Sequence, residues 1–344
     1  MARETKYNNI CNEELLQQIN DKNKKLMYSF EEYLISVDKS PTTIAQYRND
    51  LNIFFCWNVV ENNNKFFIEI TKREFMKFQL RAISFWEWSP NRLRRVKSTI
   101  SSLSNFIENI LDEEEEYSGY RSIIRKIESP MLTPVREKTV LKDDELEWLL
   151  NTLVEHKAYK QACALSLAMN SGRRKAEIPR FKSWYFNDDF VLYGSIYKTP
   201  EKVKTKGRTS KGKMLYCYTL KHTFDPYLRL WLKEREEKGI VSEWLFPKQS
   251  NPNEPISIDT MDWWKEVFSK LLNKNFYWHA VRHYVDTKLV KLNLPYHVIR
   301  EFFGWSSVAM VDVYNDLSSD EIFEKYFDEN GIREDIQPEM RVVL

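Results

Sequence analysis

The sequence has 344 residues, of which 42% are hydrophobic and 30% charged, which is typical of a globular protein with room for two domains. It contains no run of 18 apolar residues and begins with a polar stretch, so we expect no membrane span, no secretory signal and a cytoplasmic protein. The net charge of +2 does not by itself predict nucleic-acid binding. Four scattered cysteines without a Cys-x-x-Cys pair predict neither a zinc site nor a disulfide framework, and we expect reduced, mostly buried thiols.

Helical spacing of apolar residues dominates the first third of the chain. Residues 1–24 are polar and predict a tail or a short helix. After it we expect four helices. The first contains Leu26 and Leu34, and the second follows the stop and cap at Ser40-Pro41-Thr42. The third opens at the capping box Thr71–Glu74 and runs to about Phe85, and the fourth begins at Ser89-Pro90. These helices predict a small all-α domain over residues 25–128.

The rest of the chain predicts a second domain of mixed structure. Residues 129–141 contain prolines and little periodicity, as expected of a linker, and the second domain is expected over residues 142–344. Helices are expected from about Asp143 and over residues 158–169. Two stretches rich in β-formers, residues 190–197 and 214–220, predict a small antiparallel sheet with a long turn, and helices return after about Asp225. The predicted fold is mainly α with a small antiparallel β-sheet.

The charge is unevenly distributed, with basic clusters separated from an acidic run at residues 112–116. One basic cluster spans residues 202–213, within the predicted turn, and another spans residues 92–97. A site that holds DNA needs such cations for phosphate contacts, although a solvated turn would have the same composition. The candidate DNA-binding residues are Lys204, Arg208, Lys211, Lys213, Arg92, Arg94, Arg95 and Lys97.

A spaced set of residues in the last quarter of the chain predicts phosphodiester chemistry. His279 and Arg282 stand three positions apart, Trp305 follows Arg282 by 23 positions, and Tyr314 follows Trp305 by 9. A guanidinium and ring N–H groups can hold the oxygens of a phosphate, and a phenol can attack its phosphorus. Three of these residues also have a structural alternative: His279 as a core histidine, Trp305 as a packed tryptophan, and Tyr314 as one tyrosine among 18.

The second domain resembles the catalytic domain of tyrosine recombinases and phage integrases, such as the Cre and Xer proteins. Ser171-Gly172-Arg173-Arg174-Lys175-Ala176-Glu177 resembles the first arginine box of that family, and His279-Ala280-Val281-Arg282-His283 resembles the second. The resemblance implies that Arg174, rather than Arg173, is the catalytic arginine and that Glu177 supports it. Trp305 stands where the family has histidine or tryptophan, and Tyr314 stands at the nucleophile. His283 is expected to be structural.

The resemblance also implies a catalytic lysine in the hairpin between the boxes. Lys206 is our first choice, with Lys204 and Lys198 as alternatives, because the long turn makes counting from Arg174 unsafe. The fold implied is a two-domain DNA clamp, with an N-terminal helical core-binding domain and an α+β catalytic domain. The resemblance covers about residues 25 to 330.

The chemistry expected of these residues requires no metal, cofactor or ATP. A phenol with a pKa near ~10 attacks only when its proton is accepted, and two guanidiniums can stabilise the extra charge on the phosphate. A lysine can protonate the departing 5′ oxygen. The resulting phosphotyrosyl bond retains the energy of the broken phosphodiester.

The function expected is that of a site-specific recombinase, the integrase of a mobile element, acting on double-stranded DNA through a 3′-phosphotyrosyl intermediate. By resemblance, four protomers would assemble on two sites, with a monomer away from DNA, and a helix over residues 319–327 would dock on a neighbouring protomer. The alternatives are a non-catalytic DNA-binding regulator on the same scaffold and a type IB topoisomerase-like enzyme. The target DNA sequence is not encoded in any pattern that one chain displays.

Overall fold

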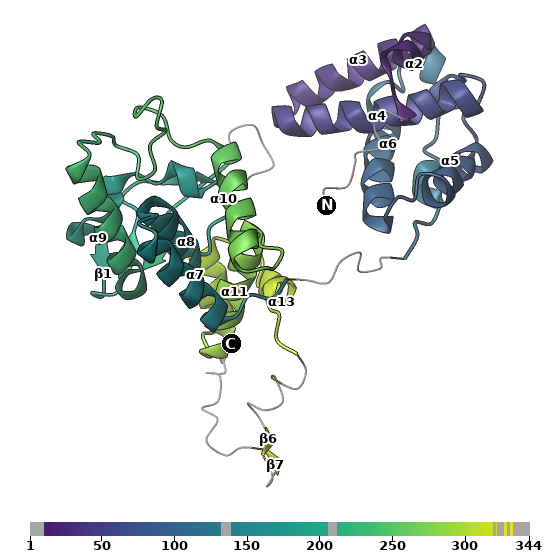
Figure 1. The fold of residues 1–344 in the computed structure, drawn as a ribbon. Coiled ribbons are helices and arrows are strands. Elements are labelled where there is room, and N and C mark those ends of the chain that lie inside the picture. Colours follow the sequence, from purple (N-terminus) through teal and green to yellow (C-terminus); the bar gives the residue numbers. More distant parts are fainter. Residues whose placement is uncertain are drawn as a thin grey trace. The chain divides into compact units, whose positions relative to one another are not determined.

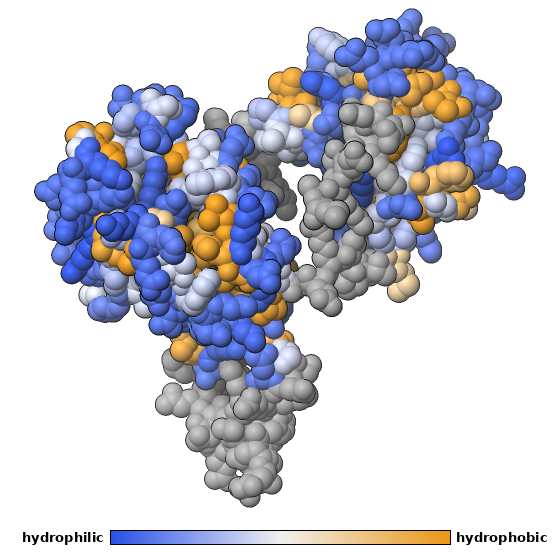
Figure 2. All heavy atoms as spheres, viewed as in Figure 1, coloured by the Kyte–Doolittle hydropathy of each residue, from blue (hydrophilic) through white to orange (hydrophobic). Residues whose placement is uncertain are grey.

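The computed structural model describes residues 10–131, 139–205, 212–318, 321, 327–328 and 331–332 (Figure 1). The described residues form two compact units, one before residue 132 and the other from residue 139 onward. Each unit has its own hydrophobic core. Within the described part of the chain, no helix is long and apolar enough to cross a membrane. Figure 2 shows hydrophilic side chains over most of the visible face of each unit.

The first unit is built from helices whose ends follow the capping signals of the sequence. Ser40 and Ser89 cap helices that begin with a proline, and Thr71 forms a capping box with Glu74, so these three predicted starts are confirmed. The helices are α2 (Glu13–Gln18), α3 (Asp21–Ser36), α4 (Pro41–Glu61), α5 (Lys72–Ser84) and α6 (Pro90–Ile110), with 3₁₀ turns η1 (Phe67–Glu69), η2 (Glu115–Tyr117) and η3 (Ile124–Lys126).

The described part of the N-terminal segment packs into this unit. Ile10 and Cys11 are buried, and the Cys11 Sγ lies 3.2 Å from the Cys56 Sγ on α4. All four cysteines of the chain are buried, as expected. Beyond α2, the first turn of α3 already begins at Asp21, within the stretch for which we expected a tail or a short helix.

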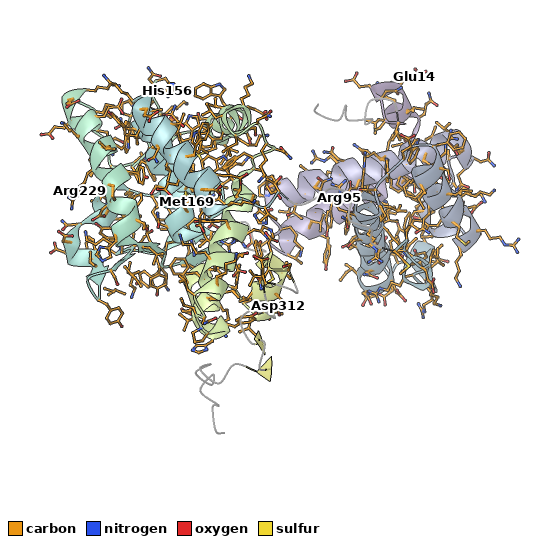
Figure 3. All side chains as sticks on the ribbon, turned by 60° about the horizontal axis from the view of Figure 1, so that its bottom comes forward. Glu14, Arg95, His156, Met169, Arg229 and Asp312 are labelled. Carbon is orange, nitrogen blue, oxygen red and sulfur yellow. The ribbon has the colours of Figure 1, made fainter. Side chains whose placement is uncertain are left out.

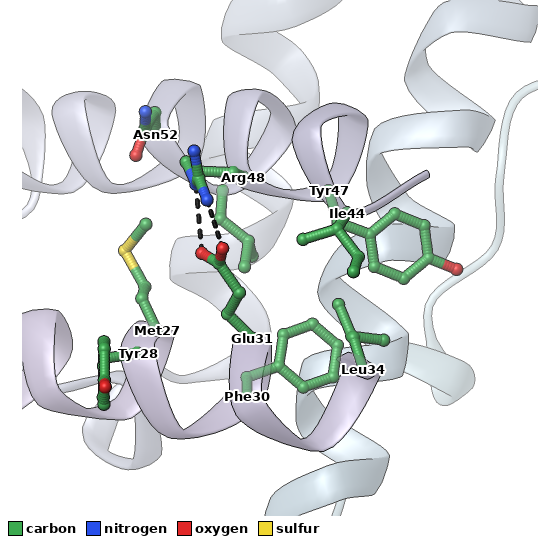
Figure 4. A pocket seen from close by; sticks show the side chains of 10 residues that line it. Met27, Tyr28, Phe30, Glu31, Leu34, Ile44, Tyr47, Arg48 and Asn52 are labelled. Atoms are coloured by element: carbon green, nitrogen blue, oxygen red, sulfur yellow. Dashed lines mark hydrogen bonds and ion pairs between the residues drawn. The ribbon is translucent and has the colours of Figure 1, made fainter. Parts of the chain in front are cut away.

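Helices α3 and α4 enclose a small hollow of about 200 Å³ on the surface of the first unit (Figure 4). The guanidinium of Arg48 on α4 forms an ion pair with Glu31 on α3 across it. The buried ring of Phe30 forms part of the lining. The hollow is therefore a gap between two packed helices that a surface ion pair bridges, and it belongs to the packing of this unit.

The second unit surrounds one buried helix. Helix α8 (Tyr159–Ser171) has nine buried residues and contacts helices on several sides. The other helices are α7 (Asp143–Glu155), α9 (Lys221–Glu237), α10 (Ile258–Leu271), α11 (Trp278–Lys291), α12 (Tyr296–Phe303) and α13 (Ala309–Tyr314), with 3₁₀ turns η4 (Ile178–Arg180), η5 (Ser183–Phe186) and η6 (Asp188–Phe190). The central position of α8 matters because the first arginine box begins at its last residue, Ser171.

The β-structure between η6 and α9 is antiparallel, as predicted, but it is divided into two sheets. Strands β1 (Val191–Leu192), β2 (Ile196–Lys198) and β5 (Tyr218–Leu220) form one sheet, and β3 (Val203–Thr205) pairs with β4 (Lys213–Leu215) in a separate hairpin. After β2, the Thr199 N–H still donates to the Cys217 carbonyl oxygen at 3.0 Å. The predicted strand over residues 214–220 is interrupted, and a hydrogen bond from the Cys217 N–H to the Thr199 hydroxyl marks the break.

The last described residues form a short antiparallel strand pair. Strand β6 (Phe327–Asp328) pairs with β7 (Gly331–Ile332). The helix expected over residues 319–327 lies mostly outside the described residues, and its last residue, Phe327, is in a strand instead.

Candidate active site

The first arginine box begins where α8 ends. Gly172 caps the helix with a φ of +60°, in the left-handed region that favours glycine. A Cβ atom at this position would overlap the ring of Phe303 on α12. The chain therefore turns sharply against α12, and the two arginines that follow have different surroundings.

Arg173 is buried and Arg174 is partly exposed. Arg173 donates hydrogen bonds to the carbonyl oxygens of Phe302 at 2.5 Å and Ser171 at 3.2 Å, so it joins α12 to the end of α8. Arg174 donates from Nη1 to Glu177 at 3.2 Å, and its side chain is 30% exposed. Of the two, only Arg174 has a guanidinium that solvent or a ligand can reach. This arrangement favours Arg174 as the functional arginine, as the resemblance of the box implies.

Glu177 is a buried carboxylate that orients Arg174. Burial alone would raise the pKa of Glu177, but the charge of Arg173 and the hydrogen bond from the Arg174 N–H, with the charges of Arg174 and Arg282, lower it. Glu177 therefore stays ionised at neutral pH. Three guanidiniums share this carboxylate, so the site has an excess of positive charge.

Arg282 lies on α11 and is almost completely buried, with 1% of its surface exposed. Its Nη1 donates to the carbonyl oxygen of Gly172 at 2.6 Å, whereas its Nε and Nη2 have no hydrogen-bond partner among the described residues. Burial, followed by the charges of Arg174 and Arg173, lowers the pKa of Arg282 to about 9. A buried donor without a partner costs about 1–3 kcal/mol, and more when it is charged. An anion bound at these atoms would remove that cost.

The rings of Trp305 and Tyr314 stack beside Arg282. The Trp305 ring stacks on two others. It is parallel to the Phe303 ring within 8°, at 4.3 Å between centroids, and it stacks on the Tyr314 ring at 5.0 Å between centroids. The guanidinium carbon of Arg282 lies 5.1 Å from the Trp305 ring and 5.4 Å from the Tyr314 ring. The Trp305 Nε1 is buried without a hydrogen-bond partner among the described residues. Gly304, with a φ of +66°, ends α12 and allows this turn.

His279 and His283 lie one helical turn apart on α11, and both contact the Tyr314 ring. The centroid distances are 5.1 Å for His279 and 4.7 Å for His283. His279 is exposed at the start of α11, so its ring can reach a ligand. His283 is mostly buried, and its Nδ1 lies 3.0 Å from the carbonyl oxygen of Tyr314. The structure thus brings together Arg174, His279, Arg282, Trp305 and Tyr314.

Asp286 is a buried carboxyl group on the same helix that sequence reasoning did not identify. Neither of its oxygens has a hydrogen-bond partner among the described residues. Burial raises the pKa of Asp286 to about 8. The charge of Arg282 acts in the opposite direction, and the charges of Asp316 and Asp312 raise this pKa further. Figure 3 labels Asp312, on α13. A carboxyl group that keeps its proton does not neutralise Arg282, which leaves Glu177 as the carboxylate shared by the three guanidiniums. Its spacing of four residues after Arg282, within the same helix, was the available signal.

The hairpin β3–β4 contacts the turn that precedes Trp305. Lys213 on β4 donates to the carbonyl oxygen of Gly304 at 3.2 Å, and Leu215 packs so closely that a Cβ on Gly304 would lie 2.5 Å from its Cδ1. Lys204 is exposed on β3, and Lys198 on β2 lies over the ring of Tyr216. Lys206 directly follows β3 but lies outside the described residues, as do Arg208 and Lys211.

The four basic residues predicted on α6 have different surroundings. Arg92 lies over the Trp88 ring, Arg95 forms an ion pair with buried Asp50 at 3.0 Å, and Arg94 donates to the Pro130 carbonyl oxygen. Lys97 is mostly buried and donates to the Ile127 carbonyl oxygen and the Ser129 hydroxyl. Figure 3 labels Arg95. Lys97 and Arg94 line one polar groove, with Tyr47, Ser98, Ser101, Ser102, Asn105, Ile124, Arg125 and Ser129.

Comparison with known proteins establishes the family. The model of the phage integrase family matches residues 139–321, which is more than half of the chain. The chain belongs to the phage integrase family. It is 29% identical over 294 residues to the SPbeta prophage-derived recombinase-like protein YomM of Bacillus subtilis, covering 82% of this chain and 84% of that protein. It is 22% identical over 309 residues to the tyrosine recombinase XerD of Chlamydia trachomatis, covering 88% and 95%.

Solved structures show that this family member has a known fold. The XerH site-specific recombinase bound to a palindromic difH substrate is 18% identical with a TM-score of 0.63, covering 83% of this chain and 78% of that one. A lambda integrase dimer bound to a COC′ core site is 14% identical with a TM-score of 0.60, covering 85% and 95%. The predicted fold class, mainly helical with a small antiparallel sheet, is therefore confirmed.

Proposed function

We propose that this integrase-family protein is a site-specific DNA recombinase in which Tyr314 attacks a DNA phosphate and forms a 3′-phosphotyrosyl bond. The observation that supports this mechanism most strongly is the state of Arg282. It is a buried cation with two donor atoms that lack partners among the described residues, and it lies against the ring of the candidate nucleophile. A phosphate oxygen supplies the acceptor and the negative charge that such a guanidinium requires.

The reaction follows from the placement of the charged groups. Tyr314 gives its phenolic proton to water as its oxygen bonds to phosphorus, and the bond from phosphorus to the 5′ oxygen breaks, so the 5′ strand leaves as a hydroxyl. Arg282 and Arg174 stabilise the charge that develops on the non-bridging oxygens, with His279 and the Trp305 Nε1–H as further donors. We assign protonation of the leaving 5′ oxygen to Lys206, with Lys204 and Lys198 as alternatives. Attack by a 5′-hydroxyl reverses the step and joins the strand.

Two parts of the chain supply cations for the DNA backbone. The polar groove of the first unit contains Arg94, Lys97 and Arg125, and the hairpin of the second presents Lys204 and Lys213. We propose that a DNA-binding domain at residues 25–128 and a catalytic domain at residues 142–344, joined by a linker, both bind double-stranded DNA around the cleavage site. We also propose that four protomers assemble on two recombination sites and that the protein acts in the cytoplasm. The prophage origin in the name of the YomM relative supports the integrase of a mobile element.

A nicked suicide duplex containing the recombination site tests the mechanism. When the nick lets a short 5′ fragment diffuse away, rejoining fails and a covalent protein–DNA adduct accumulates. We expect an adduct with the wild-type protein and with Tyr284→Phe, a control on α11, and none with Tyr314→Phe. Binding without any adduct would instead support a DNA-binding regulator.

A second duplex in the same assay separates recombination from topoisomerase chemistry. We expect strand exchange between two labelled sites, because a recombinase pairs two sites before joining. Relaxation of supercoils without exchange would contradict the proposal and favour a type IB topoisomerase-like enzyme.

A further inference from the structure

The segment that contains Tyr314 is tied to α11 by side chains that the proposed chemistry does not use. The His283 Nδ1 lies 3.0 Å from the carbonyl oxygen of Tyr314 and 3.4 Å from Asp316 Oδ1. One helical turn along α11, the Thr287 hydroxyl accepts a hydrogen bond from the Asp316 N–H at 3.0 Å. Because both side chains are on the same face of α11, they hold two backbone groups at and just after Tyr314.

These contacts matter because α13 is too short to hold its own position. It has six residues and ends at Tyr314, and a helix of this length is not stable by itself in water. The carbonyl oxygen of Tyr314 lies in the last turn, where intrahelical donors are missing. A carbonyl oxygen only accepts hydrogen bonds, so the nearby His283 Nδ1 must be the protonated nitrogen that donates to it. His283 thus supplies the bond that the helix cannot.

The side chain of His283 also contacts the phenol ring. Its ring lies 4.7 Å from that of Tyr314 at an angle of 35°, on α11, the helix that contains Arg282. One imidazole therefore contacts both the backbone and the ring of Tyr314. Its own helix also positions the guanidinium proposed to bind the phosphate, so His283 links the position of the attacking group to that of the phosphate-binding arginine.

We infer that His283 is a positioning residue for the nucleophile, through the hydrogen bond from its Nδ1 to the Tyr314 carbonyl oxygen. The inference rests on the proposed function, because it assumes that Tyr314 attacks the phosphate. Misplacement of a reacting group by about 1 Å costs on the order of 100-fold in rate. Loss of the donor should therefore slow cleavage by about 10- to 100-fold, with DNA affinity unchanged, because His283 does not contact the DNA in this role.

A matched pair of substitutions tests the donor itself. His283→Asn places an amide nitrogen close to the position of Nδ1, whereas His283→Leu has nearly the same size and no donor. Single-turnover cleavage of the suicide duplex and DNA affinity are measured for both. We expect His283→Leu to be about 10- to 100-fold slower than wild type and His283→Asn to be within about fivefold of it. Equal rates for the two variants, whether fast or slow, would overturn the inference.

A chemically altered substrate shows on which side of the reaction His283 acts. When sulfur replaces the bridging 5′ oxygen at the cleavage site, the leaving thiolate needs no proton, so a defect in the general acid disappears. A defect in placing the nucleophile remains. We expect His283→Leu to stay slow on this substrate, and recovery of its rate would assign His283 to the leaving group and overturn the inference.

Two further variants keep the test decisive. Thr287→Val removes the hydroxyl that accepts from the Asp316 N–H without changing the size of the side chain, and it tests the same tether if His283→Leu does not fold. We expect Thr287→Val to slow cleavage several-fold, and a wild-type rate would contradict the proposal that these side chains position Tyr314.

Tyr314→Phe is measured in parallel. An adduct that persists in Tyr314→Phe overturns the proposed function, whereas loss of the adduct there with a wild-type rate in His283→Leu overturns only the role of His283.

Discussion

Replacing Asp286 by asparagine should stabilise the protein near neutral pH and have little effect in acid. The carboxyl group is fully buried, and neither oxygen has a hydrogen-bond partner among the described residues. Burial, reinforced by Asp316 and Asp312, raises its pKa to about 8, although Arg282 opposes the change. Asparagine keeps a buried neutral polar group of the same shape, so the substitution removes only the cost of keeping the carboxyl protonated.

The magnitude follows from the difference between the folded and unfolded states. The pKa of an unfolded aspartate is ~3.9, so between about pH 4 and pH 8 the folded state holds a proton that the unfolded state has released. Below about pH 4 both states hold the proton, so the free energy of unfolding does not depend on this group. As the pH rises from about 4 to about 8, the free energy of unfolding of the wild type falls by ~1.4 kcal/mol per pH unit. At pH 7 the loss is ~4 kcal/mol, a large part of the ~5–15 kcal/mol typical of a domain.

Urea unfolding of the full chain at several values between about pH 5 and pH 8 measures this effect. We expect the free energy of unfolding of Asp286→Asn to exceed that of wild type by an amount that grows with pH, reaching several kcal/mol. Asp189→Asn, which changes an exposed carboxylate, serves as the control and should show no such trend. A difference between Asp286→Asn and wild type that is constant across this range would refute the reasoning.

Three further substitutions test the site. Gly172→Ala should lower the free energy of unfolding by about 2–4 kcal/mol, because alanine is strained at this φ and its Cβ would clash with Phe303. Gly239→Ala is the control, since Gly239 has a φ of +64° but open space around it, and it should lower the free energy of unfolding by only about 1 kcal/mol. Equal losses in urea unfolding would contradict the clash. Arg282→Lys keeps the charge but loses the planar pair of donors, so single-turnover cleavage should fall at least about 100-fold, and a near-normal rate would remove the bidentate role. Trp305→Phe keeps a stacking ring but loses the Nε1–H, so cleavage should slow by about 100-fold at unchanged DNA affinity; an unchanged rate would assign Trp305 to packing alone.

Helix ends in the first unit could be predicted because their signals are local. Ser40, Thr71 and Ser89 each accept a hydrogen bond from a backbone N–H three residues later, and that geometry depends on a few neighbouring residues only. The division of the β-structure could not be predicted, because it depends on which strands meet. Local β propensity at residues 214–220 gave no sign that Cys217 would bond to Thr199 and separate β4 from β5.

The candidate site shows the same contrast between spacing and tertiary contact. Resemblance to the family's first arginine box placed the functional arginine at Arg174, and the structure is consistent with it, because Arg173 donates to the carbonyl oxygens of Phe302 and Ser171. The role of Arg173 itself depends on α12, more than a hundred residues away, and no local pattern shows that contact. His283 was expected to be structural, and the contacts that suggest more, to the backbone of Tyr314 and to Asp316, also come from a distant segment.

The most direct test of the account is to identify the residue that becomes bonded to DNA. The adduct formed on the suicide duplex is digested with a protease and a nuclease, and the modified peptide is sequenced by mass spectrometry. We expect a nucleotide linked through its 3′-phosphate to the phenolic oxygen of Tyr314. A nucleotide on any other residue, or a link through a 5′-phosphate, would contradict it.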